Sequence, residues 1–262
     1  MASLSGKVAV VTGGARGIGD GIGMRLAADG ARVFALDKAA PEQWREGVTY
    51  LETDVASEES VATAFRAIDA QAGRVDILVN NAGIQRVGLV GQISFADFTN
   101  VVATHLNGFF LCASEAVPRM VKQGGGGAIV SIASTAAFVG LPGRGAYCAA
   151  KAGILGLTRA LALEVATAGI RVNAVAPGFT RTRLIEQGLA DGSLREDWMV
   201  ARVPMKRLAE VDEIVNAVRF LAGDESSYMS GQSIVVDGGW IVQGIPEAPD
   251  WLRVNGSSAG AS

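Results

Sequence analysis

Short apolar runs alternate along the chain with longer stretches in which apolar residues recur at helical spacing. The short runs are rich in β-branched residues and predict seven strands, at 7–12, 32–37, 49–54, 75–80, 128–133, 171–176 and 232–237. The longer stretches predict helices at 18–29, 58–72, 95–122, 146–168 and 211–222. Because strands buried on both faces form continuous apolar runs, this alternation predicts an α/β fold, a doubly wound parallel sheet with helices on both faces.

The composition is that of one globular domain spanning residues 1–262, with 49% hydrophobic and 19% charged residues. A net charge of −3 offers no basic surface for nucleic acid. No apolar run is long enough to span a membrane, and the N-terminus lacks a signal-peptide layout. Two cysteines and one histidine supply neither a disulfide framework nor a zinc site. We therefore expect a cytoplasmic protein with no metal, nucleic-acid partner or membrane.

A glycine-rich turn follows the first predicted strand and leads into a helix. It reads TGGARGIG at 12–19, with Gly13, Gly17 and Gly19 in a GxxxGxG spacing. Glycines here let the backbone approach a pyrophosphate, and the helix N-terminus offers free N–H groups. An ordinary glycine turn is the alternative, but the strand–turn–helix context favours a dinucleotide site.

The second predicted strand ends at Asp37, where a carboxylate can accept hydrogen bonds from the adenosine ribose. A carboxylate repels a 2′-phosphate, so Asp37 favours NAD over NADP. Arg16 and Lys38 point the other way, because either could pair with a 2′-phosphate. We weight Asp37 more, since it lies at the strand end itself.

The predicted helix beginning at Ala146 carries Tyr147 and Lys151, four residues apart and therefore on one face. A tyrosine with an ordinary pKa near 10 needs a shift of about 3 units to act as a base near pH 7. An ammonium group nearby acts in that direction with about the required magnitude. A buried tyrosine with a packed lysine is the structural alternative.

Taken together, the motifs resemble those of classical short-chain dehydrogenases/reductases over nearly the whole chain. They are TGGARGIG (12–19), DV (54–55), NNAG (80–83), the asparagine of HLNG (Asn107), Ser134, YCAAK (147–151), PGFTRT (177–182) and VDGG (236–239). The spacing of thirteen residues between Ser134 and Tyr147 is usual in this family. The resemblance implies a Rossmann-type fold and hydride transfer between a nicotinamide cofactor and a secondary alcohol or ketone.

The resemblance also implies a catalytic group of Asn107, Ser134, Tyr147 and Lys151. In it Tyr147 is the base or acid, Ser134 holds the substrate oxygen, and Asn107 holds a water that relays the proton. His105 lies two residues before Asn107 in the predicted long helix, so we expect it on a different face, in the core or an interface. Cys148 is expected to pack away from the catalytic face.

For the dinucleotide, the resemblance implies that Asp54 and Val55 hold the adenine, that Asn80 and the turn after it flank the ribose, and that Thr180 and Thr182 hold the carboxamide. The full predicted set is Gly13, Arg16, Gly17, Ile18, Gly19, Asp37, Asp54, Val55, Asn81, Ala82, Gly83, Tyr147, Lys151, Pro177, Gly178, Thr180 and Thr182. Family members are commonly homotetramers or homodimers, which we expect here too.

The substrate is expected to be a small hydroxy acid or sugar-derived acid. Gln85 and Arg144 match positions that meet the substrate carboxylate in 3-hydroxybutyrate dehydrogenases, although Ala136 stands where those enzymes have a histidine. We predict a substrate site of Gln85, Ser134, Arg144 and Tyr147, with a lid at about 183–205. A solvated loop arginine is the alternative reading of Arg144.

Three functions remain open at this point. An NAD-dependent alcohol dehydrogenase is favoured, an NADPH-dependent ketoreductase of acyl or cyclic ketones is the alternative enzyme, and a non-catalytic dinucleotide sensor is the alternative from another class. The extension at 240–262 is expected to pack across a subunit boundary and to help close the substrate pocket.

Overall fold

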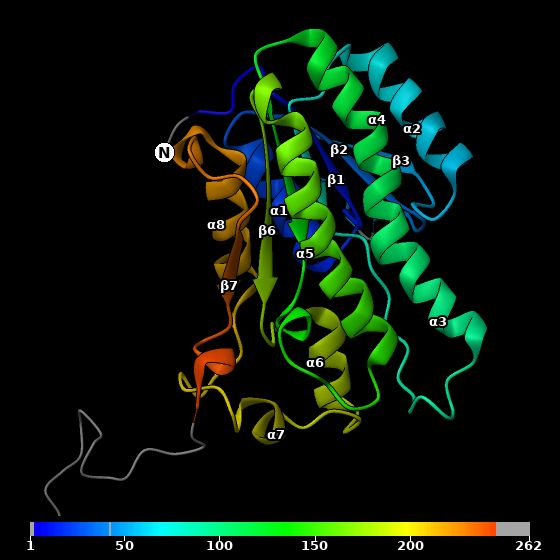
Figure 1. Ribbon diagram of the computed structural model, residues 1–262, viewed down its shortest axis with the longest axis vertical. Helices are drawn as coiled ribbons and strands as arrows, with labels where there is room; N and C mark the ends of the chain where they lie inside the picture. Colours follow the sequence, from blue (N-terminus) through cyan, green and yellow to red (C-terminus); the bar gives the residue numbers. More distant parts are fainter. Residues whose placement is uncertain (1–2, 42, 245–262) are drawn as a thin grey trace, which may run out of the picture.

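The computed structural model describes residues 3–41 and 43–244 and contains the predicted sheet (Figure 1). All seven strands are parallel, in the order β3-β2-β1-β4-β5-β6-β7. The order reverses between β1 and β4, which makes that point the topological switch. The strands are β1 (Val8–Thr12), β2 (Arg32–Asp37), β3 (Val48–Glu52), β4 (Ile77–Asn80), β5 (Gly127–Ile132), β6 (Ile170–Pro177) and β7 (Ser233–Val236).

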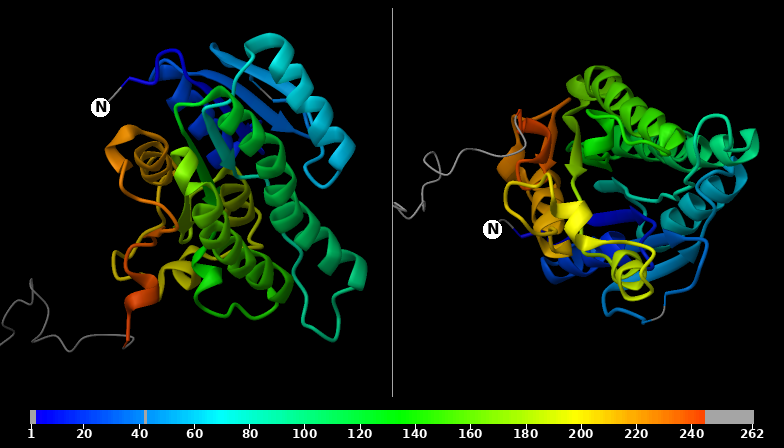
Figure 2. Two further views of the ribbon diagram at one scale, coloured as in Figure 1. Left: turned by 45° about the horizontal axis from the view of Figure 1, so that its top comes forward. Right: turned by 90° about the horizontal axis from the view of Figure 1, so that it is seen from below.

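Helices cover both faces of the sheet, as predicted (Figures 1 and 2). On one face lie α1 (Gly17–Ala28) and α8 (Val211–Ala222); on the other lie α2 (Glu58–Ala72), α4 (Gly108–Gln123) and α5 (Gly145–Val165). Strand side chains alternate between two apolar cores: Val8 and Val10 join one, while Ala9 and Val11 join the other. Both cores need apolar residues, which explains why the strands are continuous apolar runs.

The predicted helix over 95–122 is wrong in one respect, because it is not continuous. It is made of α3 (Phe95–Val102), a π-helical turn η1 (Ala103–Asn107) and α4. A π-turn inserts an extra residue and changes which side chains face inward after it. The described residues also form four 3-10 turns, η2 (Thr135–Ala137), η3 (Ala166–Ala168), η4 (Asp224–Ser226) and η5 (Trp240–Val242).

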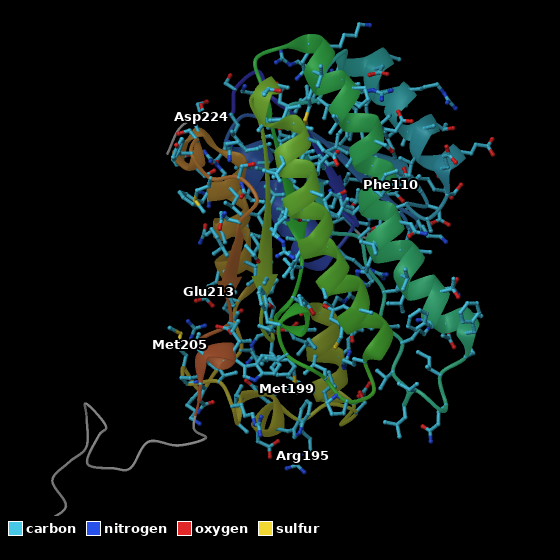
Figure 3. The ribbon with its side chains drawn as sticks, viewed as in Figure 1. Phe110, Arg195, Met199, Met205, Glu213 and Asp224 are labelled. Carbon is cyan, nitrogen blue, oxygen red and sulfur yellow. The ribbon has the colours of Figure 1, made fainter. Side chains whose placement is uncertain are left out.

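The carboxyl ends of the strands lie at the lower end of the molecule in Figure 1, next to two short helices, α6 (Arg183–Ala190) and α7 (Glu196–Val200). Both belong to the predicted lid segment, where no helix was expected. Met199 of α7, labelled in Figure 3, is 2% exposed and anchors this segment. Of the extension predicted at 240–262, residues 245–262 lie outside the described residues.

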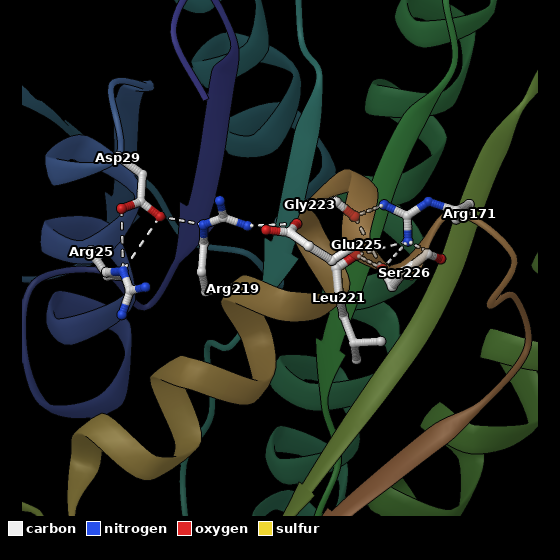
Figure 4. Close-up of polar contacts among 8 residues, drawn as sticks. All are labelled: Arg25, Asp29, Arg171, Arg219, Leu221, Gly223, Glu225 and Ser226. Carbon is white, nitrogen blue, oxygen red and sulfur yellow. Dashed lines mark hydrogen bonds and ion pairs between the residues drawn. The ribbon is translucent and has the colours of Figure 1, made fainter. Parts of the chain in front are cut away.

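A chain of charged contacts fastens α8 to the rest of the fold (Figure 4). The Arg219 side chain is 2% exposed and pairs with Asp29 at the end of α1 and with Glu225 at 3.3 Å. Beside it, Arg171 of β6 donates from Nη1 to the carbonyl of Leu221 at 2.9 Å and from Nη2 to the carbonyl of Gly223 at 2.9 Å. A buried guanidinium is stable only while its acceptors remain.

Asp29→Asn should lower the free energy of unfolding by about 3 kcal/mol, since it leaves the buried Arg219 guanidinium short of one carboxylate. Guanidinium chloride denaturation followed by circular dichroism measures this. The matched control is Glu52→Gln on the exposed end of β3, for which the change should stay within about 0.5 kcal/mol. Equal effects of the two substitutions would contradict the prediction.

Candidate active site

The turn between β1 and α1 requires glycine. Gly13 and Gly17 have φ values of 64° and 59°, which favour glycine. A Cβ atom at Gly19 would collide with the carbonyl oxygen of Gly13. The side-chain amide of Asn81 holds the turn by donating to the carbonyls of Thr12 and Gly13, both at 3.0 Å. This backbone can therefore approach a phosphate closely.

Beside the turn lies a cavity of about 580 Å³, large enough for a dinucleotide. Most of the predicted cofactor residues line it: Gly13, Arg16, Gly17, Ile18, Asp37, Asp54, Val55, Asn81, Ala82, Gly83 and Thr182. Gly19 and Lys151 do not line it; Gly19 packs against the turn, and Lys151 is buried below. The glycine cradle and the polar lining fit an adenine dinucleotide.

The Asp37 carboxylate is held at the edge of this cavity by backbone groups. Its Oδ2 accepts from the N–H of Ala15 at 3.1 Å, and its Oδ1 accepts from the N–H of Ala39 at 3.2 Å. Lys38 instead pairs with Asp54 at 2.8 Å, and this hydrogen bond holds the pKa of Asp54 below its usual value. The lysine predicted to favour NADP is thus engaged by a carboxylate.

Ser134 follows β5, and Tyr147 and Lys151 lie in the first turns of α5, so the fold brings these three together. The Ser134 hydroxyl accepts from the N–H of Ala136 at 3.1 Å, which fixes its orientation. Lys151 is 3% exposed, donates to the carbonyl of Ile132 at 2.6 Å, and places its Nζ 5.5 Å from the centre of the Tyr147 ring. A phenol, a hydroxyl and an amine thus meet at one strand end.

The pKa of Tyr147 is not lowered by Lys151 in the way that the sequence suggested. Burial raises the pKa of Tyr147, while its hydrogen bond with Ser134 and the charge of Arg144 act to lower it. Burial also lowers the pKa of Lys151 to about 7. The lysine alone therefore does not bring the pKa of Tyr147 below its ordinary value, and further positive charge or further support for the ammonium is needed.

Asn107 of the predicted catalytic group is the last residue of the π-turn η1. It is exposed and does not line the cavity beside the glycine turn, and its predicted role in holding a water stays a prediction. His105 and Asn107 do lie on different faces, as expected, but His105 is the residue that faces inward. Its ring meets the Tyr147 ring edge-on, with centroids 5.3 Å apart. The sequence offered one signal for this: His105 is the sole histidine of the chain.

A second cavity, of about 490 Å³, adjoins the first, since Ile18, Thr182 and Leu184 line both. All four predicted substrate residues line it, namely Gln85, Ser134, Arg144 and Tyr147. Pro177, Gly178 and Thr180, predicted for the cofactor, also face this cavity. It therefore lies where a substrate could meet both the phenol and a nicotinamide.

Sequence reasoning missed the aromatic wall of the second cavity. The Phe179 ring stacks on the Trp240 ring with centroids 4.7 Å apart, and its centroid lies 6.1 Å from that of Trp198 in α7. Phe179 lies inside the PGFTRT motif, but the pattern gave no sign that its ring joins two distant tryptophans. This wall makes one side of the cavity apolar and leaves Arg144 as a cation on its lining.

In the described part of the chain, no helix is long and apolar enough to cross a membrane. The same residues contain no cluster of three or more histidine, cysteine or acidic side chains placed to hold a metal ion.

The chain matches known proteins over most of its length. The family model described as enoyl-(acyl carrier protein) reductase covers residues 13–241. A 3-oxoacyl-[acyl-carrier-protein] reductase of Staphylococcus aureus is 38% identical over 244 residues, which are 89% of this chain and 97% of the relative. The 2-(R)-hydroxypropyl-CoM dehydrogenase of Xanthobacter autotrophicus is 38% identical over 247 residues, 89% and 98% of the two chains.

Among solved structures, the ligand-free aldohexose dehydrogenase of Thermoplasma acidophilum superposes with a TM-score of 0.87 at 30% identity, covering 94% of this chain and 98% of that one. These similarities agree with the seven-stranded sheet, the glycine turn and the tyrosine–lysine pair of α5. The chain is therefore a classical member of the short-chain dehydrogenase/reductase family, oxidoreductases that act on CH–OH and keto groups.

Proposed function

We propose that this protein is an NAD-dependent dehydrogenase that interconverts a secondary alcohol and a ketone on a small hydroxy acid or sugar-derived acid. Arg144 is the observation that carries the proposal. It is half-buried, lines the second cavity and lies three residues before Tyr147. Among the described residues its guanidinium has no carboxylate partner. A planar cation without a partner at the wall of a cavity favours a carboxylate ligand.

In this proposal, each polar side chain that lines the substrate cavity has a defined role. Tyr147 takes the proton from the substrate hydroxyl in oxidation and returns it in reduction, while Ser134 donates to the same oxygen and orients it. Thr180 and Thr182 border the cavity where the carboxamide of the cofactor would be held. The bound nicotinamide would exchange a hydride with the substrate carbon. Arg144 and Gln85 then bind the acid end of the substrate.

Asp37 is the residue that supports NAD rather than NADP as the cofactor. Its carboxylate is fixed at the edge of the dinucleotide cavity, where it would accept hydrogen bonds from ribose hydroxyls and repel a 2′-phosphate. Lys38 is paired with Asp54, which leaves Arg16 as the predicted cation that could favour NADP.

A ketoreductase of acyl ketones is the second candidate. The apolar wall of Phe179, Trp198 and Trp240 favours it, because an acyl chain would pack there. The Staphylococcus aureus relative is named for a reaction of this kind. A non-catalytic sensor has less support, since Ser134 and Tyr147 line a substrate-sized cavity and Lys151 is buried beside Tyr147.

The predicted homodimer or homotetramer also remains a proposal. Phe110 of α4 is 57% exposed and lies on the outer face of that helix in Figure 3, and Leu163 of α5 is 83% exposed. Large apolar side chains on the outer faces of two adjacent helices are typical of subunit contacts. This face supports assembly through α4 and α5.

Tyr147→Phe should lower turnover by at least about 100-fold, because the group that exchanges the proton is lost. Calorimetric affinity for NADH should stay within about threefold, since the ring remains. A panel of hydroxy acids, sugar acids and plain alcohols, followed by NADH absorbance, measures the rates. The control is Tyr228→Phe, whose ring is fully exposed. Full turnover by the Tyr147 variant would refute the proposed chemistry.

Asp37→Asn should reduce the preference of kcat/KM for NAD over NADP by about tenfold or more, because the charge that repels the 2′-phosphate is removed. Steady-state kinetics with each cofactor give the ratio. Glu52→Gln is the matched control, since Glu52 is the register partner of Asp37 on β3 but does not line the cavity. An unchanged ratio in the Asp37 variant, or a wild type that prefers NADP, contradicts the NAD assignment.

Arg144→Gln should lower kcat/KM for a hydroxy acid by about 10- to 100-fold, the cost of a lost charge-assisted pair. The acidic limb of the pH–rate profile should also move to higher pH, because the charge of Arg144 lowers the pKa of Tyr147.

The amide of the same hydroxy acid separates these two effects: it lacks the carboxylate, so its kcat/KM should fall much less, while the shift of the pH limb remains. Arg66→Gln on the exposed face of α2 is the control. Equal losses on the acid and the amide would show that Arg144 does not bind the carboxylate.

A further inference from the structure

The phenol of Tyr50 holds the turn that follows β2, although Tyr50 does not itself line the dinucleotide cavity. Tyr50 lies on β3, next to β2 at one edge of the sheet, and its register partner is Ala35, two residues before the end of β2 (Figure 1). Its hydroxyl donates to the carbonyl of Asp37 at 2.7 Å and to the carbonyl of Ala39 at 2.5 Å. One side chain therefore ties together both ends of the turn at 37–39.

This hydroxyl is fixed as a donor. It has one proton for two carbonyls, so it donates a three-centre hydrogen bond. Burial, together with the negative charges of Asp37 and Glu52, raises the pKa of Tyr50, and the phenol therefore keeps its proton at neutral pH. The Trp44 ring packs edge-on against the Tyr50 ring, with centroids 5.9 Å apart, which further restricts the position of the phenol.

The two carbonyls depend on Tyr50 to different extents. The carbonyl of Asp37 also accepts from the N–H of Thr53 at 2.8 Å, in the ladder between β2 and β3, so it keeps a donor without the phenol. Among the described residues, Tyr50 is the one donor to the carbonyl of Ala39. The hydroxyl therefore matters most for the Ala39 end of the turn.

The Ala39 end of the turn in turn orients the Asp37 carboxylate. Oδ1 of Asp37 accepts from the N–H of Ala39 at 3.2 Å, while Oδ2 accepts from the N–H of Ala15 in the glycine turn at 3.1 Å. A chain of contacts thus runs from the phenol through the backbone of Ala39 to the charge. Asp37 and Ala39 line the dinucleotide cavity and Tyr50 does not, so Tyr50 acts on that cavity through the turn.

We propose that Tyr50 is a positioning residue for cofactor choice: by fixing the turn at 37–39, its hydroxyl keeps the Asp37 carboxylate where it accepts hydrogen bonds from a ribose and repels a 2′-phosphate. The inference rests on the proposed function, which uses Asp37 to select NAD. Without the hydroxyl, the N–H of Ala39 moves away from Oδ1, and the carboxylate is free to adopt other rotamers. The charge is then still present but less well placed.

Tyr50→Phe tests this, because it removes the hydroxyl and keeps the ring against Trp44. Calorimetric titration of the full chain with NADH and with NADPH, without substrate, gives the two affinities. We expect the ratio of NADH affinity to NADPH affinity to fall by about three- to tenfold, as for the loss of one neutral hydrogen bond. Tyr228→Phe is the matched control, since that side chain is fully exposed, and its ratio should stay within about 1.5-fold of wild type.

A double-mutant cycle with Asp37→Asn shows whether Tyr50 acts through the carboxylate. Once the charge is gone its placement no longer matters, so Tyr50→Phe should change the affinity ratio by less than about twofold in that background. A merely structural role would weaken NADH and NADPH equally, or would change the ratio equally in both backgrounds. Either result would overturn the proposal.

Steady-state kinetics provide a second readout. In Tyr50→Phe the KM for NAD should rise by about threefold or more while kcat at saturating NAD stays within about twofold, because the reacting groups are untouched. A lower kcat with an unchanged KM would also contradict the inference. Tighter binding of NADPH than of NADH by the wild type would contradict the proposed NAD function alone, since the coupling between Tyr50 and Asp37 is measured independently of that preference.

Discussion

The buried ammonium of Lys151 is the constraint around which the site is organised. It lies inside α5 with the carbonyl of Ile132 as its protein acceptor, and burial lowers its pKa to about 7. An ammonium in this setting loses its proton unless acceptors surround it. The end of β5, the π-turn at His105 and the helix start at Tyr147 all converge on this group, so its charge couples elements from three parts of the sequence.

The sheet makes this convergence possible. All seven strands are parallel, so their carboxyl ends meet at one edge, and the switch between β1 and β4 opens a crevice there. The glycine turn follows β1, Asn81 follows β4, and Ser134 follows β5. Each arrives at the same edge because a strand ends there, and the two adjoining cavities occupy the space that these strand ends leave.

The sequence predicted the framework well because its signals are local. Apolar runs located all seven strands to within two residues, and α2 and α8 were predicted with their observed bounds. The spacing placed Tyr147 and Lys151 on one helix face, and the family resemblance added Ser134 to them. The glycine turn and Asp37 were located by the strand–turn–helix pattern, and the structure places them beside one cavity.

What the sequence did not predict depends on non-local geometry. Asn107 was assigned from the family resemblance within one continuous predicted helix, whereas the π-turn that ends at Asn107 interrupts that helix and His105 within the turn is buried. The helices α6 and α7 are short, and their charged residues carry little periodicity. The stack of Phe179 on Trp240 joins residues about sixty positions apart, which no local pattern encodes.

The position of Arg144 links substrate binding to the chemistry. Its charge acts to lower the pKa of Tyr147. In the proposed function, a substrate carboxylate paired with Arg144 would offset part of that effect, and the tyrosinate would then depend more on Lys151 and on an oxidised nicotinamide. For the proposed acid substrate, the positive charge of Lys151 would therefore matter more than for a neutral one.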